Sequence, residues 1–275
     1  MDNATICQTR FPLFMVHGTG FRDYKLVGYW GRIPKALEEN GATLFYGQQD
    51  CWGTVEENAA TLKENLLALI EENQLEKVNI LAHSKGGLEA RYLASVLGCA
   101  PYIASITTIA TPHGGSKTMD KLVKLPKPLI RISGFFINCW YRMMGDKNPD
   151  FYTTCHQFTS EYTDQFNRNV QDVPGIYYQS VATVMKKPAS DFFLWFPNLI
   201  VGLTDEENDG LLTLASVSRW PDTRIWRGSG LRGISHVDSI DLRRHPFSKK
   251  ANSEGISDIT TAYVRLVSEL AQDGF

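Results

Sequence analysis

The sequence predicts an α/β fold in which helices cover both faces of a mainly parallel sheet. Short apolar runs that end in glycine-rich turns alternate with segments whose apolar residues recur at helical spacing. The runs that predict buried strands are residues 11–16, 78–82 and 103–109. The segments that predict helices are residues 30–40, 55–74 and 88–97. Such alternation is typical of parallel strands joined by crossover helices.

The pattern changes between residues 116 and 173, where aromatic residues are frequent and prolines and glycines interrupt the apolar periodicity. We interpret this segment as a helical cap inserted into the sheet domain. The sheet is expected to resume at residues 176–184 and again near 223–226, and a helix is expected over 257–272. The chain is therefore predicted to form a single domain, 1–275, that contains the cap or lid 116–173.

Composition and charge favour one globular domain that binds no nucleic acid. Of the 275 residues, 43% are hydrophobic and 21% are charged, which suffices for one large core. The 28 basic residues are balanced by 30 acidic ones, so the basic surplus that phosphate binding requires is missing. The five cysteines are scattered without a CxxC pair, which predicts free thiols rather than disulfides or a zinc site.

No segment of the sequence predicts a membrane span or a signal peptide. A spanning helix needs roughly 18 to 20 consecutive apolar residues, and no stretch approaches that length. The first twenty residues lack a basic region followed by an apolar one. The chain as written is expected to be cytoplasmic, and a secreted mature form that has lost its signal is the alternative.

The strongest chemical signal is the pentapeptide Ala82-His83-Ser84-Lys85-Gly86, which lies between a predicted strand and a predicted helix. A serine flanked by small residues in this place is typical of the nucleophile elbow of the α/β-hydrolase fold. The small residues are needed because the turn is tight. The turn holds the serine hydroxyl over a helix N-terminus, where backbone amides and the helix dipole favour negative charge. The alternative is a serine in an ordinary glycine-rich turn.

A second glycine turn, His17-Gly18-Thr19-Gly20, follows the first predicted strand. Acyl transfer needs two donors for the tetrahedral oxyanion, and the elbow supplies only one. The backbone amides of Thr19 and Lys85 are the expected pair, and His17 is expected to be structural. The alternative is a simple turn.

The catalytic histidine should follow the serine and the acid in the chain. Three of the six histidines lie at the glycine turns and one lies in the cap, which leaves His236 and His245. His236 is preferred because it lies in a short loop after the last predicted strand. His245 lies in an Arg-Arg-His-Pro run that is typical of a solvated surface.

The acid is expected in the turn Asn208-Asp209-Gly210, ahead of an apolar segment, from which a carboxylate could reach His236. Such a sequence is ordinarily a plain turn, and only its position favours Asp209. The neighbours Asp205, Glu206 and Glu207 are competitors. In the expected reaction Ser84 attacks, His236 acts as general base and Asp209 orients the imidazole, before water hydrolyses the acyl-enzyme.

Taken together, these and other residues resemble the true bacterial lipases of the Burkholderia, Pseudomonas and Proteus type and related esterases. The resemblance covers nearly the whole chain and departs at Ala82, Lys85 and Thr19, where the family more often has Gly, Gln or His, and Leu. Its motifs are Val16-His17-Gly18, Tyr29-Trp30, Gly41-Ala42, Lys77-Val78-Asn79, His83-Ser84, Gly86-Gly87-Leu88, Arg91-Tyr92, Ala104-Ser105, Thr107-Thr108-Ile109, Thr111-Pro112-His113, Asn208-Asp209-Gly210-Leu211 and His236 with Asp238.

The resemblance also implies a structural calcium ion beside the histidine loop. Its carboxylate ligands correspond to Asp238, two residues after His236, and to Asp191, eighteen residues before Asp209. Carbonyl ligands correspond by position to Leu242 and Pro246, and such an oxygen set suits a hard cation. The alternative is that Asp191 caps a helix and Asp238 is an exposed loop residue.

The expected function is that of a serine-dependent carboxylic ester hydrolase, a triacylglycerol lipase or lipolytic esterase without an organic cofactor. A cluster of apolar residues between 135 and 144 is either part of the core or a lid that contacts a lipid surface. The alternatives are an acyltransferase, another chemistry on the same triad, or an inactive module that binds an apolar ligand. Acyl-chain preference and oligomeric state stay open.

Overall fold

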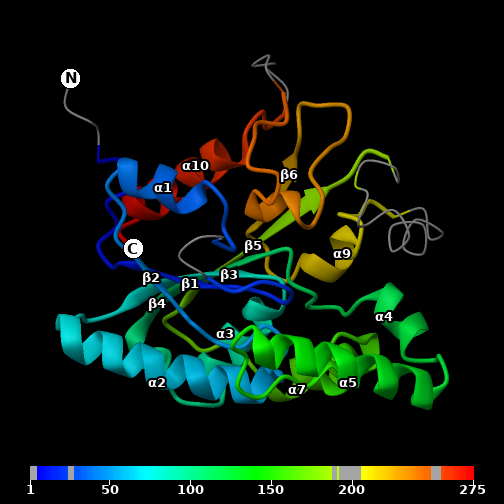
Figure 1. Cartoon of the computed structure of the whole chain (residues 1–275). Coiled ribbons are helices and arrows are strands. Elements are labelled where there is room, and N and C mark those ends of the chain that lie inside the picture. The colour runs from blue at the N-terminus through cyan, green and yellow to red at the C-terminus, as the bar shows by residue number, and fades with distance from the viewer. Residues whose placement is uncertain (1–4, 24–27, 188–190, 192–205, 249–254) are drawn as a thin grey trace.

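The computed structural model describes residues 5–23, 28–187, 191, 206–248 and 255–275 (Figure 1). The described residues form one sheet of six strands in the order β2-β1-β3-β4-β5-β6. All neighbouring strands are parallel, so the predicted sheet type is confirmed. The strands are β1 (Leu13–Val16), β2 (Leu44–Tyr46), β3 (Val78–His83), β4 (Ile103–Ile109), β5 (Tyr177–Val184) and β6 (Thr223–Arg227).

Two pairs of helices cover the two faces of this sheet (Figure 1). Helices α1 (Ile33–Glu39) and α10 (Ile259–Gln272) pack on one face, where they share a core with Leu13 and Met15. Helices α2 (Val55–Asn73) and α3 (Lys85–Ser95) pack on the other, where they share a core with Phe14 and Val16. The alternation of β1 side chains between the two cores is the period of two that a strand imposes. Burial of each large apolar side chain contributes about 1.5–3 kcal/mol, so both helix layers hold the sheet.

Strand β2 and the start of α3 were not predicted. Strand β2 has only three residues, all half-buried at the sheet edge, which is too short for a periodicity to be recognised. Helix α3 begins at Lys85, directly after the serine, rather than at Leu88, because Gly86 and Gly87 are helical despite their low helix propensity.

The cap segment holds α4 (Lys117–Leu122), α5 (Lys127–Met143), α6 (Phe151–Gln157) and α7 (Ser160–Asn169). Phe166 of α7 and the following Val170 join a core cluster with Val55 of α2 and Leu88 of α3. Helix α5 instead exposes most of its apolar residues. The segment therefore contributes to the core through α7 and to the surface through α5. The remaining elements are η1 (Ala100–Tyr102), α9 (Leu214–Val217) and η3 (Asp238–Ile240).

Across the described residues, no helix combines the length and the apolar character that crossing a membrane requires.

Candidate active site

The turn between β3 and α3 holds Ser84 in a backbone conformation with φ 54° and ψ −125°. A non-glycine residue with positive φ in such a sparsely populated region costs on the order of 1–3 kcal/mol, so the surrounding packing must impose it. The packing is close: a Cβ on Gly86 would lie 2.6 Å from the backbone oxygens of both Val16 and His17. Only glycine allows α3 to approach the end of β1 this closely, and this approach brings the two glycine turns together.

Ser84, His236 and Asp209 form a hydrogen-bonded series at the carboxyl end of the sheet. The Ser84 Oγ lies 3.1 Å from His236 Nε2, and His236 Nδ1 lies 2.8 Å from Asp209 Oδ2. The other carboxylate oxygen of Asp209 accepts the amides of Leu211 and Leu212 at 2.9 and 2.8 Å. Because these amides fix the carboxylate, Asp209 presents one oxygen to the imidazole in a defined direction. This arrangement can remove the serine proton.

Two of the competing acids, Glu206 and Glu207, pair with other residues than the histidine. Glu206 pairs with Lys117 at the surface, and Glu207 forms an exposed ion pair with Arg227. Asp205 lies outside the described residues.

The other candidate histidine, His245, is exposed and its Nδ1 contacts the Pro246 carbonyl at 2.9 Å. The cap histidine, His156, similarly contacts the carbonyl of Tyr152 within α6. Of the two candidates from the C-terminal region, the structure brings only His236 to the serine.

The two amides expected to bind the oxyanion belong to residues in the two glycine turns. Thr19 and Ser84 both line the same cavity, and Lys85 is the first residue of α3. Within the described part of the chain, neither the Thr19 nor the Lys85 amide donates a hydrogen bond to a backbone oxygen outside its own helix or strand. The preceding amide, that of Gly18, is bonded to the Tyr29 hydroxyl at 2.9 Å. The two amides stay the expected oxyanion donors.

A hydrogen-bond chain that sequence reasoning missed connects the Gly18 turn to the His236 loop. Tyr29 accepts from the Gly18 amide and contacts His83 Nδ1 at 2.7 Å, while His83 Nε2 lies 2.8 Å from the Ser239 hydroxyl. Ser239 in turn donates to the His236 carbonyl at 2.6 Å. Burial lowers the pKa of His83 well below its usual range, so the ring is neutral and can accept at Nδ1 and donate at Nε2. The sequence signal for this chain was His83, a histidine at the end of the mainly apolar strand β3.

The hydrogen-bonded series that begins at Ser84 opens into a cavity of about 290 Å³ whose walls are mainly apolar. A concave apolar site with a few convergent polar groups is the usual form of a small-molecule site. Its walls include Phe21, Trp52, Pro112, Met119, Phe158, Leu211, Leu212, Val237 and Ile240. This cavity suits an acyl chain rather than a charged substrate.

The two aspartates expected to bind calcium lie on either side of one guanidinium group. Arg243 Nε is 3.0 Å from Asp238 Oδ1, and its Nη2 is 3.1 Å from Asp191 Oδ2. Ser235, which precedes His236, donates to Asp191 from its hydroxyl at 2.9 Å and to Asp238 from its amide at 3.3 Å. Both carboxylates are buried, so the alternative that Asp238 is an exposed loop residue is wrong.

These residues do not fit a divalent ion while Arg243 lies between them. A cation in the same place would have to displace the guanidinium and would be repelled by its charge. Of the two carbonyls expected to complete the site, that of Pro246 accepts from the His245 ring, and Leu242 is half-buried nearby in the chain. Calcium stays a prediction, and Arg243 is the competing cation.

Comparison with known proteins relates the chain to lipases. No protein-family model matches the chain. It is 28% identical to triacylglycerol lipase 2 of Saccharomyces cerevisiae over 264 residues. This alignment covers 90% of the chain and 75% of the yeast protein. It is 31% identical over 180 residues to a triacylglycerol lipase of Burkholderia plantarii, or 60% of this chain and 49% of that protein. Over most of its length the chain is similar to triacylglycerol lipases.

The chain has the α/β-hydrolase fold of solved lipase structures. The Staphylococcus hyicus lipase superposes with a TM-score of 0.70 at 17% identity, over 99% of this chain and 98% of that one. The relatives are named triacylglycerol lipases, which supports a carboxylic ester hydrolase. Acyl transfer and passive ligand binding, the alternatives drawn from the sequence, are not favoured by these relatives.

The series of three residues predicts how substitutions rank. Ser84→Ala and His236→Ala should each lower kcat by at least 10³-fold, about the loss expected when a member of a triad is removed. Asp209→Asn should cost a similar factor, because the amide favours the wrong imidazole tautomer. Glu207→Gln, the control, loses only an exposed pair with Arg227 and should keep wild-type kcat. Ester hydrolysis at saturating substrate measures all four, and an Asp209→Asn enzyme with wild-type kcat would refute this acid.

The contacts of Arg243 predict that EDTA leaves the Tm of the wild-type protein unchanged. Arg243→Ala should lower Tm by on the order of 10 °C, because removing the partner of buried carboxylates costs about 3–5 kcal/mol. Added calcium should restore part of the Tm of this variant, since the vacated carboxylates can then share a cation. Arg244→Ala, the control, removes only an exposed contact with the Gly28 carbonyl and should leave Tm unchanged. A lower Tm of the wild type in EDTA, reversed by calcium, would instead establish the metal.

Proposed function

We propose that this protein hydrolyses carboxylic esters of lipids through an acyl-enzyme formed on Ser84. The observation that carries the proposal is the series Ser84, His236 and Asp209 opening into an apolar cavity. Triacylglycerols are the substrates that the names of the relatives suggest.

In the proposed reaction the Ser84 hydroxyl transfers its proton to His236 Nε2 as Oγ bonds to the ester carbon. Asp209 accepts from Nδ1 and stabilises the resulting imidazolium. The amides of Thr19 and Lys85 stabilise the oxyanion of the tetrahedral intermediate. As the intermediate collapses, the carbon–oxygen bond to the alcohol breaks and His236 returns the proton to the leaving alcohol. Water, deprotonated by His236, then hydrolyses the acyl-enzyme and releases the carboxylic acid.

Helix α5 is proposed to contact the lipid surface. Six of its apolar side chains are each more than half exposed, and large exposed apolar patches mark surfaces that bind proteins or membranes. Near the C-terminal end of α5 the Tyr141 hydroxyl donates to the Gly20 carbonyl at 2.8 Å. The helix therefore adjoins the turn of residues 17–20, here called the oxyanion turn. The exposed residues are Leu129, Ile132, Phe135, Phe136, Trp140 and Met143.

The apolar cavity predicts a dependence on acyl-chain length. Each methylene that enters it contributes about 0.8 kcal/mol, which corresponds to roughly a fourfold rise in kcat/KM. A series of p-nitrophenyl esters should show this rise from acetate upward until the cavity is full, and then a plateau or decline. A series without any increase beyond acetate would argue against lipid esters while leaving the serine chemistry intact.

The exposed face of α5 predicts a selective defect on aggregated substrate. Replacing Phe136, Trp140 and Met143 together by serine should lower hydrolysis of an emulsified triacylglycerol at least tenfold, because surface binding is lost. Hydrolysis of a soluble short-chain ester should change by less than about twofold, since these residues do not line the cavity. Leu231→Ser, which changes an equally exposed leucine outside α5, is the control and should affect neither rate. Equal losses on both substrates would contradict the surface role.

A further inference from the structure

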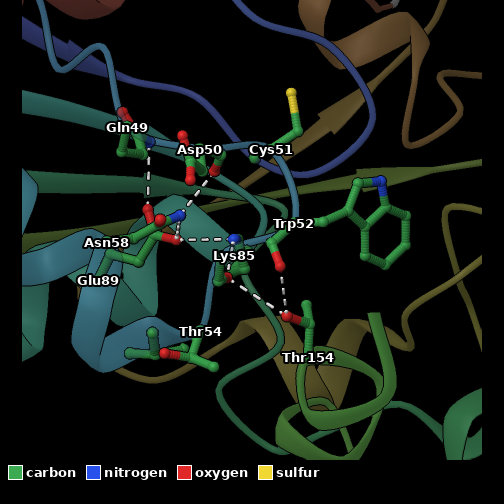
Figure 2. A network of polar contacts seen from close by, with 12 residues as sticks. Gln49, Asp50, Cys51, Trp52, Thr54, Asn58, Lys85, Glu89 and Thr154 are labelled. Atoms are coloured by element: carbon green, nitrogen blue, oxygen red, sulfur yellow. Dashed lines mark hydrogen bonds and ion pairs between the residues drawn. The ribbon is translucent and has the colours of Figure 1, made fainter. Parts of the chain in front are cut away.

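The residue after the proposed nucleophile begins a buried ionic network that the proposed reaction does not use (Figure 2). The side chains of Lys85 and Glu89, one turn apart on α3, are both completely buried, and their charged groups lie 3.1 Å apart. Neither lines the active-site cavity, so the pair does not touch substrate.

The contacts of this pair extend to a neighbouring loop and helix. Lys85 Nζ donates to the Gly53 carbonyl at 2.6 Å. Glu89 accepts from Asn58 Nδ2 at 2.7 Å and from Gln49 Nε2 at 3.1 Å (Figure 2). Burial raises the pKa of Glu89, and the charge of Lys85 and these hydrogen bonds oppose that rise. The network therefore favours the ionised form of Glu89, whereas burial disfavours it.

The loop between β2 and α2, residues 49–53, is held from both sides. On the elbow side, Gln49 donates to the His17 carbonyl at 2.8 Å, next to the oxyanion turn. On the cap side, Thr154 of α6 contacts the carbonyls of Trp52 and Gly53 at 3.1 and 3.3 Å. Trp52 lines the active-site cavity. The Lys85–Glu89 pair lies on α3, which carries one expected oxyanion amide. Through the 49–53 loop the pair is connected to the turn of residues 17–20, which carries the other, and to Trp52 in the cavity wall.

A buried ion pair is a costly way to gain stability. Removing two charges from water costs several kcal/mol per ion, and apolar residues of similar volume are often equally stable or more so. A device that only filled space would not need charges here. Hydrogen bonds to charged groups are directional and strong, so they fix positions that apolar packing leaves adjustable.

We propose that the Lys85 side chain is a positioning residue for the oxyanion hole, an inference that rests on the proposed hydrolase function. The backbone of Lys85 supplies one oxyanion amide, and its side chain fixes that residue to the loop beside the other. The pair sets the distance between the Thr19 and Lys85 amides and places Trp52 at the cavity. It acts on the tetrahedral intermediate, so its loss should affect kcat more than KM.

The test replaces the pair by apolar residues of similar volume, Lys85→Met with Glu89→Leu, so that no buried charge is left unpaired. We expect kcat for a soluble ester to fall about 10- to 100-fold, since a misplacement of 1 Å can cost 10²-fold, with KM within about threefold of wild type. The inhibition constant of an alkyl trifluoromethyl ketone, whose serine adduct carries an oxyanion, should rise by a similar factor. Hydrogen exchange at residues 17–20 and 49–53 should become faster.

The chain offers a matched control in Lys35 and Glu39, which repeat the same spacing on α1 with side chains 80% and 62% exposed. Lys35→Met with Glu39→Leu should leave kcat and the inhibition constant unchanged. If the apolar variant at 85 and 89 does not fold, Lys85→Gln with Glu89→Gln removes both charges but keeps polar side chains, and it should show the same effects at smaller size.

Three outcomes separate this proposal from the proposed function. A folded variant with wild-type kcat, inhibition constant and exchange rates would overturn the positioning role. Equal losses in the control would do so as well, because the effect would not belong to the buried pair. If the wild-type protein hydrolyses no ester, the proposed function fails. Faster hydrogen exchange at residues 17–20 and 49–53 in the variant would then still support the positioning of these segments by the Lys85–Glu89 pair. Unchanged exchange would overturn that positioning role.

Discussion

The positive φ of Ser84 is the constraint on which the rest of the site depends. A backbone turned this sharply ends β3 and starts α3 within one residue, and it is possible only because Gly86 lets the helix meet the end of β1. That contact brings the turn after β1 beside the turn after β3, which are 66 residues apart in the chain. The strain, on the order of 1–3 kcal/mol, is offset by the two buried helix layers on the sheet.

Around this turn the protein combines buried polar groups with an apolar cavity. Asp209 is fixed by two backbone amides, His83 is held between two hydroxyl groups, and Glu89 is held by a lysine and two amide side chains. Each would be costly if unpartnered, so each arrangement is stable only in its bonded geometry. The polar groups near the serine are therefore oriented before substrate arrives, and the apolar walls supply binding without competing for them.

The sequence predicted the elements whose residues are buried on both faces, such as β3 and β4, because short, mainly apolar or β-branched runs that end in glycine turns are typical of buried strands. It placed Ser84 and His236 through chain order and turn chemistry. It could not identify the Lys85–Glu89 pair, because Lys35 and Glu39 show the same spacing and are exposed. Only the packing of the 49–53 loop over α3 separates the two cases. Likewise, nothing local in residues 191, 238 and 243 indicates that one guanidinium contacts both carboxylates.

Helices α7 and α5 of the cap differ in how strongly their contacts hold them to the rest of the protein. Phe166 of α7 is buried in a core cluster, so moving α7 would expose apolar surface that folding has already removed from water. Helix α5 already exposes six large apolar side chains, and burying each fully in a lipid phase contributes up to about 1.5–3 kcal/mol. The hydrogen bond from Tyr141 to Gly20 contributes only about 0.5–1.5 kcal/mol. Contact with lipid can therefore outweigh the bond that ties α5 to the oxyanion turn, whereas the α7 contacts should survive it.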